Sequence, residues 1–438
     1  ELLPYLVRRL LENGANSSFI NQYLNNNIPV VDLAQNPGDI IKERIDHLDI
    51  SNLALPRNLY LPRLNSNGLD LNEMDCIEDL MSKVNKFSEL SFHAYSISPH
   101  DPLNNVPIKI TSKCNAKIIG IVETCDFKSI DINCINPSEQ WINYSIESRN
   151  EILISVADRL EDEQAKFVYL LMHEAGKTLE DALDEIREAV DFLRYYAHQA
   201  LNLQPVPQRG PTGENNILEY QPKGIVLCIS PWNFPLAITI GQIAAALAAG
   251  NTVISKPSEH TPIIAFEAVN LFFEQGLPKD ALHLFLGSGE LGQAILLNQT
   301  IDLVAFTGSL QTAKEIHKSL SLKPGKIIPL IAETGGLNTM IVDSSALLER
   351  ACDDIIRSAF NSAGQRCSAL RLLLVHQEVY SELILMLKGA MNDLTIGIPD
   401  DLCTDIGPII TFEAMEKLDH YLAKMESDGH SLFQVSKE

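Results

Sequence analysis

Residues 224–230, with the sequence GIVLCIS, decide the fold that this chain is expected to adopt. The run between the glycine and the serine is wholly apolar, and a run of this length fits a fully buried strand. Residues 236–249 form a longer apolar segment that ends at Gly250, as a helix closed by glycine does. A second short run, rich in β-branched residues, follows at 252–256. Strand, helix and strand in this order predict two parallel strands joined by a crossover helix.

The same alternation continues toward the C-terminus and predicts a doubly wound parallel sheet covered on both faces. The further strands expected are 283–287, 303–307 and 327–332, and the further helices are 262–275, 290–298 and 309–320. A second α/β unit is expected after Gly336, with strands 339–343 and 370–376 and helices 347–362 and 379–394. Upstream, we expect extended structure at 106–135 and long helices at 145–174 and 178–201.

The composition excludes some classes of protein. The chain has 438 residues, 45% of them hydrophobic and 21% charged, and a net charge of -23. Nucleic-acid binding requires a basic surface, so this acidity argues against it. The longest apolar stretch, 236–249, is too short to cross a bilayer. The eight cysteines are scattered without a C-x-x-C pair, so we expect free thiols, no metal and a cytoplasmic location.

Three short motifs carry reactive side chains. Cys367 lies in QRCSA after an expected helix, Glu333 lies in AETGG at the end of an expected buried strand, and Asn233 lies in SPWNFP. A thiolate attacks carbonyls, a carboxylate can act as a general base, and a side-chain amide can hold an oxyanion. Each alone has an ordinary alternative: an inert thiol, a solvated carboxylate and a turn-forming amide. Together they are what oxidation of an aldehyde through a covalent thioester needs.

With these motifs the chain resembles the aldehyde dehydrogenase superfamily over roughly residues 90–438. Within it, the chain is similar to the L-glutamate-γ-semialdehyde (pyrroline-5-carboxylate) dehydrogenase module of the bifunctional proline utilization A family. The resemblance implies that Cys367 is the nucleophile and that Glu333 activates water against the thioester. It implies that Asn233, with the Cys367 backbone N–H, holds the oxyanion. It also implies an aldehyde dehydrogenase-like α/β fold with a Rossmann-like NAD domain and a second, partial catalytic domain.

NAD is the cofactor that the resemblance implies. Lys256 and Glu259, in KPSE, would reach the adenosine ribose, where a carboxylate favours NAD over NADP. Residues 308–309 open an expected helix, whose N–H groups can meet a pyrophosphate. The match of 287–292 to G-x-G-x-x-G is a weak signal alone. The cofactor-binding residues expected are Ser230, Pro231, Trp232, Lys256, Ser258, Glu259, Gly287, Gly289, Phe306, Gly308, Ser309 and Gly335.

Substrate binding is assigned by the resemblance to Ser368, which follows the nucleophile, and to Arg366, which precedes it. The N-terminal residues 5–19 resemble the last helix of a proline dehydrogenase barrel, in which Arg8 and Arg9 would hold a carboxylate and Glu12 would lie near FAD. Without the barrel, a solvated basic helix is the alternative. These features suggest an internal piece of a bifunctional protein, whose parent would use FAD as well as NAD, form a homo-oligomer and associate peripherally with membranes.

The expected organisation is a barrel-helix remnant at 1–24, a linker at 25–90, an NAD-binding domain at 91–336 and a truncated thiol-bearing domain at 337–438. The function expected is NAD-dependent oxidation of glutamate semialdehyde in proline catabolism. A general or succinate-semialdehyde dehydrogenase and an inactive NAD-binding fragment remain as alternatives. A DNA-binding regulator is the weaker third alternative, because none of the 438 residues encodes a DNA-binding module.

Overall fold

The computed structural model describes residues 54–98, 106–125 and 135–435, together with the single positions Val7, Pro29, Asn36, Gly38, Ile41 and Lys42. The chain divides into two units, Glu1–Leu59 and Tyr60–Glu438. In the first unit, the described part includes the 3-10 turn η2 (Pro56–Asn58). Arg8, Arg9 and Glu12, in the expected N-terminal helix, lie outside the described residues. Every element that follows belongs to the second unit.

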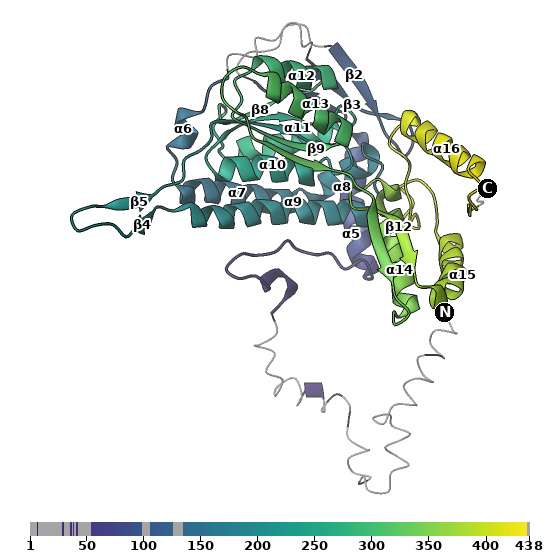
Figure 1. Ribbon diagram of the computed structural model, residues 1–438. Helices are drawn as coiled ribbons and strands as arrows, with labels where there is room; N and C mark the ends of the chain where they lie inside the picture. Colours follow the sequence, from purple (N-terminus) through teal and green to yellow (C-terminus); the bar gives the residue numbers. More distant parts are fainter. Residues whose placement is uncertain are drawn as a thin grey trace. The chain divides into compact units, whose positions relative to one another are not determined.

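A five-stranded parallel sheet lies at the centre of the described part of this unit (Figure 1). Its order is β10-β9-β6-β7-β8, so the order reverses direction between β9 and β6. The strands are β6 (Ile225–Ile229), β7 (Thr252–Lys256), β8 (Leu282–Leu284), β9 (Leu303–Gly308) and β10 (Leu330–Thr334). The doubly wound parallel sheet expected from the sequence is therefore confirmed, with strand bounds within a few residues.

Helices cover both faces of this sheet. Below it in Figure 1 lies α10 (Ala237–Ala248), and above it lie α12 (Gly289–Asn298) and α13 (Leu310–Leu322); α11 (Pro262–Glu274) packs in the same core as α10. The lower helices share one apolar core with the long helices α7 (Ile146–Asp162), α8 (Gln164–His173) and α9 (Leu179–Ala200). The upper helices share a second core with the other face of the sheet. Two hydrophobic faces and two helical layers follow from the continuous apolar strands.

The helical stretch expected at 145–174 is two helices. Glu163, at the junction of α7 and α8, has φ -94° and ψ 17°, outside the helical region. Its backbone N–H donates to the Arg159 carbonyl and so closes α7. The apolar pattern continues across the junction because both helices pack on the same core, which explains why it suggested one helix.

Residues 60–90, which were expected to be linker, lie within the second unit. The Ser66 N–H and hydroxyl both donate to the Asp191 carboxylate of α9, at 2.6 and 3.0 Å. Leu80 and Val84 of α5 (Met74–Val84) are buried in the core shared with the long helices. The polar composition of this stretch reflects such side-chain bonds to helices, and residues 60–90 therefore pack as part of the second unit.

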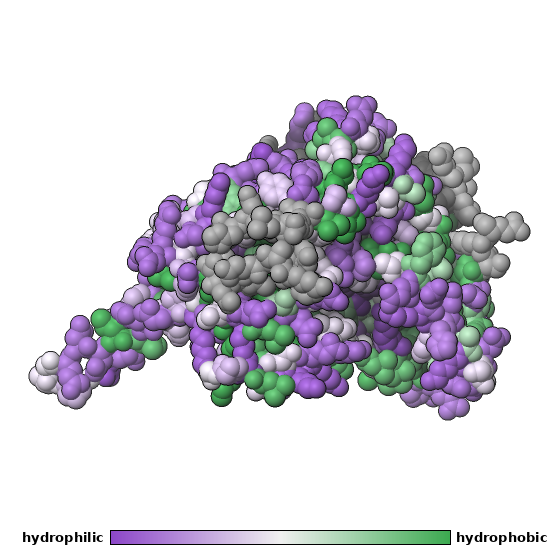
Figure 2. Space-filling view, turned by 90° about the horizontal axis from the view of Figure 1, so that it is seen from above, coloured by the Kyte–Doolittle hydropathy of each residue, from purple (hydrophilic) through white to green (hydrophobic). Residues whose placement is uncertain are grey.

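Smaller elements surround the main sheet. They are η3 (Asn85–Glu89), β1 (Phe92–Tyr95), β2 (Val106–Thr111), β3 (Ile118–Thr124), α6 (Glu139–Ile142), η5 (Leu201–Leu203), β4 (Val206–Gln208) and β5 (Asn216–Leu218). Strands β1, β3 and β2 form a three-stranded sheet, which confirms extended structure within 106–125. Strands β4 and β5 form a projecting hairpin that the sequence analysis did not anticipate (Figure 1). Figure 2 shows hydrophobic surface on this projection. Val206, Ile217 and Leu218 of the hairpin are exposed.

The thiol-bearing part begins with a parallel pair, β11 (Asn338–Val342) and β12 (Leu370–Val375). It packs on α14 (Leu348–Phe360) and α15 (Gln377–Asp393) around a small core of its own, as expected. The turn η6 (Asn361–Gly364) follows α14, and α16 (Phe412–Ser427) follows later. Strand β10, however, is not buried as expected: it pairs only with β9 in the described part of the sheet, and Ile331 is 54% exposed. No described helix has the length and apolar character needed to span a membrane.

Candidate active site

The thiol proposed as nucleophile lies on a sharply bent loop. Cys367 is exposed and follows η6, in which Ser362 and Ala363 have φ of 54° and 55°. Gly364 continues the bend with φ 68°. Left-handed backbone is strained for serine and alanine, so other contacts must hold this loop in place.

All three residues expected to be catalytic line one pocket. The pocket has a volume of about 560 Å³, and Cys367, Glu333 and Asn233 are among its lining residues. They come from three separate segments: the loop after η6, the end of β10, and the loop after β6. The fold therefore brings together the thiol, the carboxylate and the amide that the motifs suggested. This pocket is called the thiol pocket below.

Asn233 is tied directly to the loop that carries the thiol. Its amide nitrogen donates to the Gln365 carbonyl at 2.8 Å, two residues before Cys367. The Gln365 side chain is held in turn, because its Oε1 accepts the Ile410 N–H at 3.0 Å and its Nε2 donates to the Pro408 carbonyl at 3.3 Å. The loops carrying the amide and the thiol are thus fixed relative to each other and to the segment before α16.

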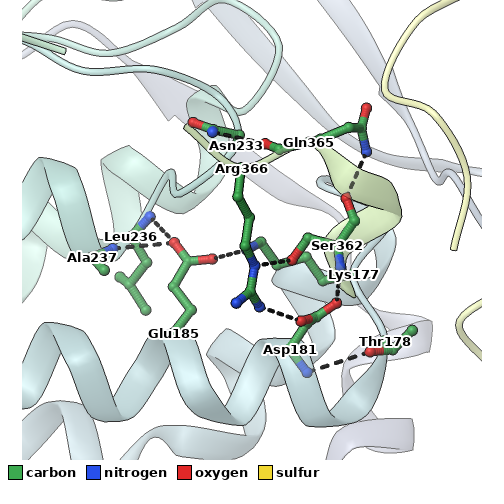
Figure 3. A network of polar contacts seen from close by, with 10 residues as sticks. All are labelled: Lys177, Thr178, Asp181, Glu185, Asn233, Leu236, Ala237, Ser362, Gln365 and Arg366. Carbon is green, nitrogen blue, oxygen red and sulfur yellow. Dashed lines mark hydrogen bonds and ion pairs between the residues drawn. The ribbon is translucent and has the colours of Figure 1, made fainter. Parts of the chain in front are cut away.

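A buried carboxylate on α9 holds the other side of the same loop (Figure 3). Asp181 is 4% exposed, and it accepts the Ser362 backbone N–H at 2.9 Å and an Arg366 guanidinium N–H at 2.6 Å. The Arg366 Nε also donates to the Ser362 hydroxyl at 3.1 Å. The guanidinium expected to bind substrate is therefore engaged within the protein at two of its three nitrogens.

A second buried pair supports the loop that carries Asn233 (Figure 3). Glu185 is fully buried, and its Oε1 accepts the backbone N–H groups of Leu236 and Ala237 at 2.8 and 3.2 Å, at the start of α10. Its other oxygen lies 2.7 Å from the Lys177 ammonium. That ammonium lies 4.0 Å from the ring centre of Phe234, next to Asn233. A carboxylate at a helix N-terminus is favourable, so this pair fixes where the loop ends and α10 begins.

A second pocket, of about 540 Å³, opens at the carboxyl ends of β6 and β9, where the strand order reverses. In open α/β sheets this is where ligands bind. Most of the expected cofactor residues line it: Ser230, Pro231, Trp232, Lys256, Ser258, Glu259, Gly289, Phe306, Gly308 and Ser309. The Lys256 ammonium lies 3.5 Å from the Glu259 carboxylate. Burial lowers the pKa of Lys256, and Glu259 opposes that shift.

Three expected residues lie elsewhere. Gly287 lines a smaller adjoining pocket together with Glu259, and Gly335 lines the thiol pocket. Ser368 is exposed and is not among the lining residues of the thiol pocket. Its assignment to the substrate remains a prediction.

The cofactor cleft and the thiol pocket adjoin. Both are lined by the 231–232 segment after β6 and by residues 307–309 at the end of β9. A dinucleotide that lies along the cleft would therefore place one end next to the thiol pocket. The two pockets therefore share this wall.

Sequence reasoning missed the residues that hold the loops. Asp181 and Glu185 lie on the helix expected at 178–201, but the backbone N–H groups and the guanidinium that they bind lie far away in the sequence, so no local pattern marks them. Gln365 is next to the motif arginine, which was the one available signal. Lys417 and Leu418 of α16 also line the thiol pocket, and no motif predicted that they would.

Comparison with known proteins agrees with this geometry. Residues 105–437 match the model of the aldehyde dehydrogenase family. The chain belongs to the aldehyde dehydrogenase family.

Two curated relatives are more specific. The chain is 39% identical over 451 aligned positions to the bifunctional protein PutA of Klebsiella aerogenes, with 100% of this chain and 34% of that protein covered. It is 34% identical over 333 positions to 1-pyrroline-5-carboxylate dehydrogenase of Bacillus subtilis, with 74% of this chain and 65% of the relative covered. The chain thus spans about one third of the length of the PutA relatives.

Solved structures give the same result for the fold. A mutant of Bradyrhizobium japonicum proline utilization A superposes with a TM-score of 0.77 and 41% identity, covering 100% of this chain and 42% of that one. A 1-pyrroline-5-carboxylate dehydrogenase from Thermus, solved with bound NAD, has a TM-score of 0.79 and 24% identity, covering 87% of this chain and 76% of that one. The expected aldehyde dehydrogenase-like α/β fold is confirmed.

Proposed function

We propose that this chain carries an NAD-dependent dehydrogenase that oxidises L-glutamate γ-semialdehyde, the open form of pyrroline-5-carboxylate, to L-glutamate. The observation that carries the proposal is the thiol pocket, in which Cys367, Glu333 and Asn233 lie beside the cleft at the strand reversal. The similarity to PutA and to 1-pyrroline-5-carboxylate dehydrogenase supports the choice of substrate.

The first step is attack of the Cys367 thiolate on the aldehyde carbon. A sulfur–carbon bond forms, and the carbonyl π electrons move to the oxygen, which becomes an oxyanion. The Asn233 amide has two N–H donors, of which one engages the Gln365 carbonyl. The other, with the Cys367 backbone N–H, would stabilise the oxyanion, a contribution of about 3–4 kcal/mol to the barrier.

NAD fits the residues of the cleft. The buried Lys256 ammonium and the Glu259 carboxylate supply a donor and an acceptor suited to ribose hydroxyls. The α12 N-cap, Ser288, makes no side-chain cap hydrogen bond, and Gly289 has open space where a Cβ would stand, so backbone can approach a ligand there. When bound, NAD accepts the hydride, with its two electrons, that leaves the thiohemiacetal carbon as the thioester forms.

Hydrolysis completes the reaction. Glu333 would take a proton from water as the water oxygen attacks the thioester carbonyl. The carbon–sulfur bond then breaks, the thiolate of Cys367 returns, and the carboxylic acid product leaves as glutamate. Glu333 is exposed at the end of β10 and lines the pocket, so water and carboxylate can meet there.

The substrate's α-carboxylate and amino group need partners beyond the thiol. We assign this role to Ser368 and to the region of Arg366, the two neighbours of the nucleophile. Asp181 already accepts a hydrogen bond from the Arg366 guanidinium. Arg366 can therefore offer the substrate its remaining guanidinium nitrogen and its positive charge. Arg366 therefore also acts as a positioning residue for the thiol loop.

The test is NADH formation from glutamate semialdehyde by the protein, alongside succinate semialdehyde and a simple aliphatic aldehyde. A strong preference for the α-amino dicarboxylic semialdehyde supports the proposal. Equal rates on all three would instead support a general aldehyde dehydrogenase. Absence of NAD binding and of thiol labelling by an aldehyde analogue would leave a catalytically silent nucleotide-fold module.

The same proposal includes the wider protein. PutA relatives are bifunctional by name, so we propose that the dehydrogenase acts with an FAD-dependent proline dehydrogenase in one cytoplasmic, homo-oligomeric protein that associates peripherally with membranes. The residues 5–19 that suggest the FAD domain lie outside the described part, except Val7. Reconstitution of proline oxidation and NADH formation in the whole protein tests this part.

A further inference from the structure

A thiol, an imidazole and a carboxylate meet at a second place, away from the thiol pocket. Ligand atoms of Cys114, His173 and Asp400 all lie within 4.8 Å of one another, and the His173 Nε2 lies 3.2 Å from a carboxylate oxygen of Asp400. Among the residues that the structure describes, this is the one set of three such side chains close enough to share an ion. We propose that these three residues form a zinc-binding site.

The three ligands come from segments that the fold packs together. Cys114 lies in the turn between β2 and β3, His173 ends α8, and Asp400 follows α15. The turn is fixed on the helix end, because the Lys113 N–H donates to the His173 carbonyl at 2.7 Å. The Cys114 thiol also faces this helix end, because it donates to the Met172 carbonyl at 3.5 Å. Two of the ligands are therefore held in place by the backbone.

The imidazole is oriented as metal-bound histidines usually are. Its Nδ1 is hydrogen-bonded to the Ser112 hydroxyl at 2.8 Å, and that hydroxyl oxygen also accepts the Cys114 backbone N–H at 3.0 Å. Metal-ligating histidines commonly use the second ring nitrogen for an outer hydrogen bond, which fixes the ring and the tautomer. With the proton on Nδ1, the lone pair of Nε2 faces the Asp400 carboxylate, and a cation between them removes the repulsion.

The chemistry of the set selects zinc. Thiolate, imidazole and carboxylate are the zinc ligands of proteins, and three protein ligands with an open side leave room for a water. Cys114 is 8% exposed and His173 is 7% exposed, whereas the Asp400 side chain is 38% exposed and provides the open side. The charges sum to zero, because the +2 of zinc balances the -1 of a thiolate and the -1 of a carboxylate. A neutral site is compatible with burial.

Metal binding would also change the state of the thiol. Burial, reinforced by the Asp400 carboxylate, raises the pKa of Cys114 to about 12, so the metal-free residue is a protonated thiol. Zinc binds the thiolate, so the sulfur–hydrogen bond breaks and the proton passes to solvent as the zinc–sulfur bond forms. The alternative is a metal-free cluster in which the thiol and the imidazole Nε2–H both donate to Asp400.

Zinc would brace the loop that carries the catalytic thiol. The segment from Asp400 continues to Pro408 and Ile410, whose backbone groups hold the Gln365 side chain. Gly176, just after α8, lies against this segment: a Cβ added there would be 2.9 Å from a Pro408 carbon. A metal that joins α8 to residue 400 would therefore restrict the motion of the 400–410 segment, which supports the 361–368 loop.

The experiment is a zinc titration of the full chain against a chromophoric chelator, after metal removal, in a Cys367→Ala background. That background removes the exposed catalytic thiol as a competing ligand. We expect one equivalent of zinc to bind and the thermal unfolding midpoint to rise with it. Cobalt in place of zinc should give a thiolate-to-metal charge-transfer band. Cys114→Ser and Asp400→Asn should each abolish stoichiometric binding, and Ser112→Ala should weaken it by about 10–100-fold.

Cys403→Ser is the matched control, because Cys403 is an exposed thiol three residues from Asp400 and outside the cluster. It should leave zinc affinity and the cobalt band unchanged. Failure to bind one equivalent, or binding that survives both Cys114→Ser and Asp400→Asn, would overturn the proposal. Should Cys114→Ser fail to fold, Asp400→Asn at the exposed side decides the question alone.

Discussion

The cofactor cleft and the thiol pocket are built in different ways, although they share a wall. The cleft lies at the end of a parallel sheet whose strands are fixed by backbone ladders and by cores on both faces. The 361–368 loop of the thiol pocket has left-handed backbone at Ser362 and Ala363 and is held by side chains from distant segments. A site of the first kind is fixed by topology, and a site of the second kind depends on a few long-range polar contacts.

The largest expected effect comes from the thiol itself. Cys367→Ala should lower the rate of NADH formation by several orders of magnitude, since loss of a nucleophile removes the covalent route. NAD binding should be preserved, because the cleft does not depend on this side chain. The measurements are steady-state NADH absorbance and an NAD titration. Cys403→Ala is the control, and equal activity of both variants would contradict the assignment.

Asn233→Ala tests whether the amide acts on the oxyanion. We expect kcat to fall by about 100–1000-fold, which corresponds to loss of one oxyanion donor. Because the same amide holds the Gln365 carbonyl, a loop effect must be separated from a chemical one. The rate of Cys367 labelling by a small alkylating reagent makes this separation. If labelling slows as much as kcat, the amide positions the loop and does not stabilise the transition state.

Asp181→Asn tests the dependence of the thiol pocket on distant side chains. The change removes the buried partner of Arg366 and weakens the acceptor for the Ser362 N–H. We expect the free energy of unfolding to fall by about 1–3 kcal/mol and kcat to fall with it. NAD affinity should be unchanged.

Asp184→Asn is the matched control for this comparison, since its pairs with Arg187 and Arg357 are long, at 3.8 and 3.9 Å, and partly exposed. It should shift the free energy of unfolding by at most about 0.5 kcal/mol. Chemical denaturation and steady-state kinetics measure both variants. Equal effects would show that the loop does not rely on the buried carboxylate.

The smallest effect is expected in the cleft. Glu259→Gln should improve use of NADP relative to NAD by about fivefold, because one like-charge contact at 4 Å in water is worth about 1 kcal/mol. Protein stability should not change, since Glu259 has a 46% exposed side chain. The ratio of kcat/KM for the two cofactors is the measurement. Glu315→Gln, another carboxylate lining the cleft, should leave that ratio unchanged; an equal shift would remove Glu259 from the ribose position.

The sequence predicted the sheet that forms the cofactor cleft better than the contacts that hold the thiol pocket. The strands of the central sheet and its helices were predicted to within a few residues, since apolar runs and glycine ends are local signals. The three motifs expected to be catalytic were recognised in the sequence, and the fold places their residues around one pocket. The exposure of β10 was missed, because an apolar run does not say whether a strand lies at the edge or the centre.

The contacts within the 60–90 stretch had no sequence signal either, because their partners are residues of distant helices such as Asp191. The same holds for the zinc-site proposal. Spacing rules find metal ligands that lie close together in the chain, whereas residues 114, 173 and 400 are far apart.

The sequence alone predicted the class of fold, the strands and helices of the central sheet in their order along the chain, and the side chains proposed to be reactive. These depend on local periodicity and on short motifs, which are written in consecutive residues. Only the tertiary structure decided that Asp181 holds Arg366, that Gln365 joins the 361–368 loop to Asn233, and that a thiol, an imidazole and a carboxylate meet elsewhere. Such contacts join segments that are far apart in the chain, by more than a hundred residues for Asp181 with Arg366 and for Asn233 with Gln365, and only folding brings those segments together.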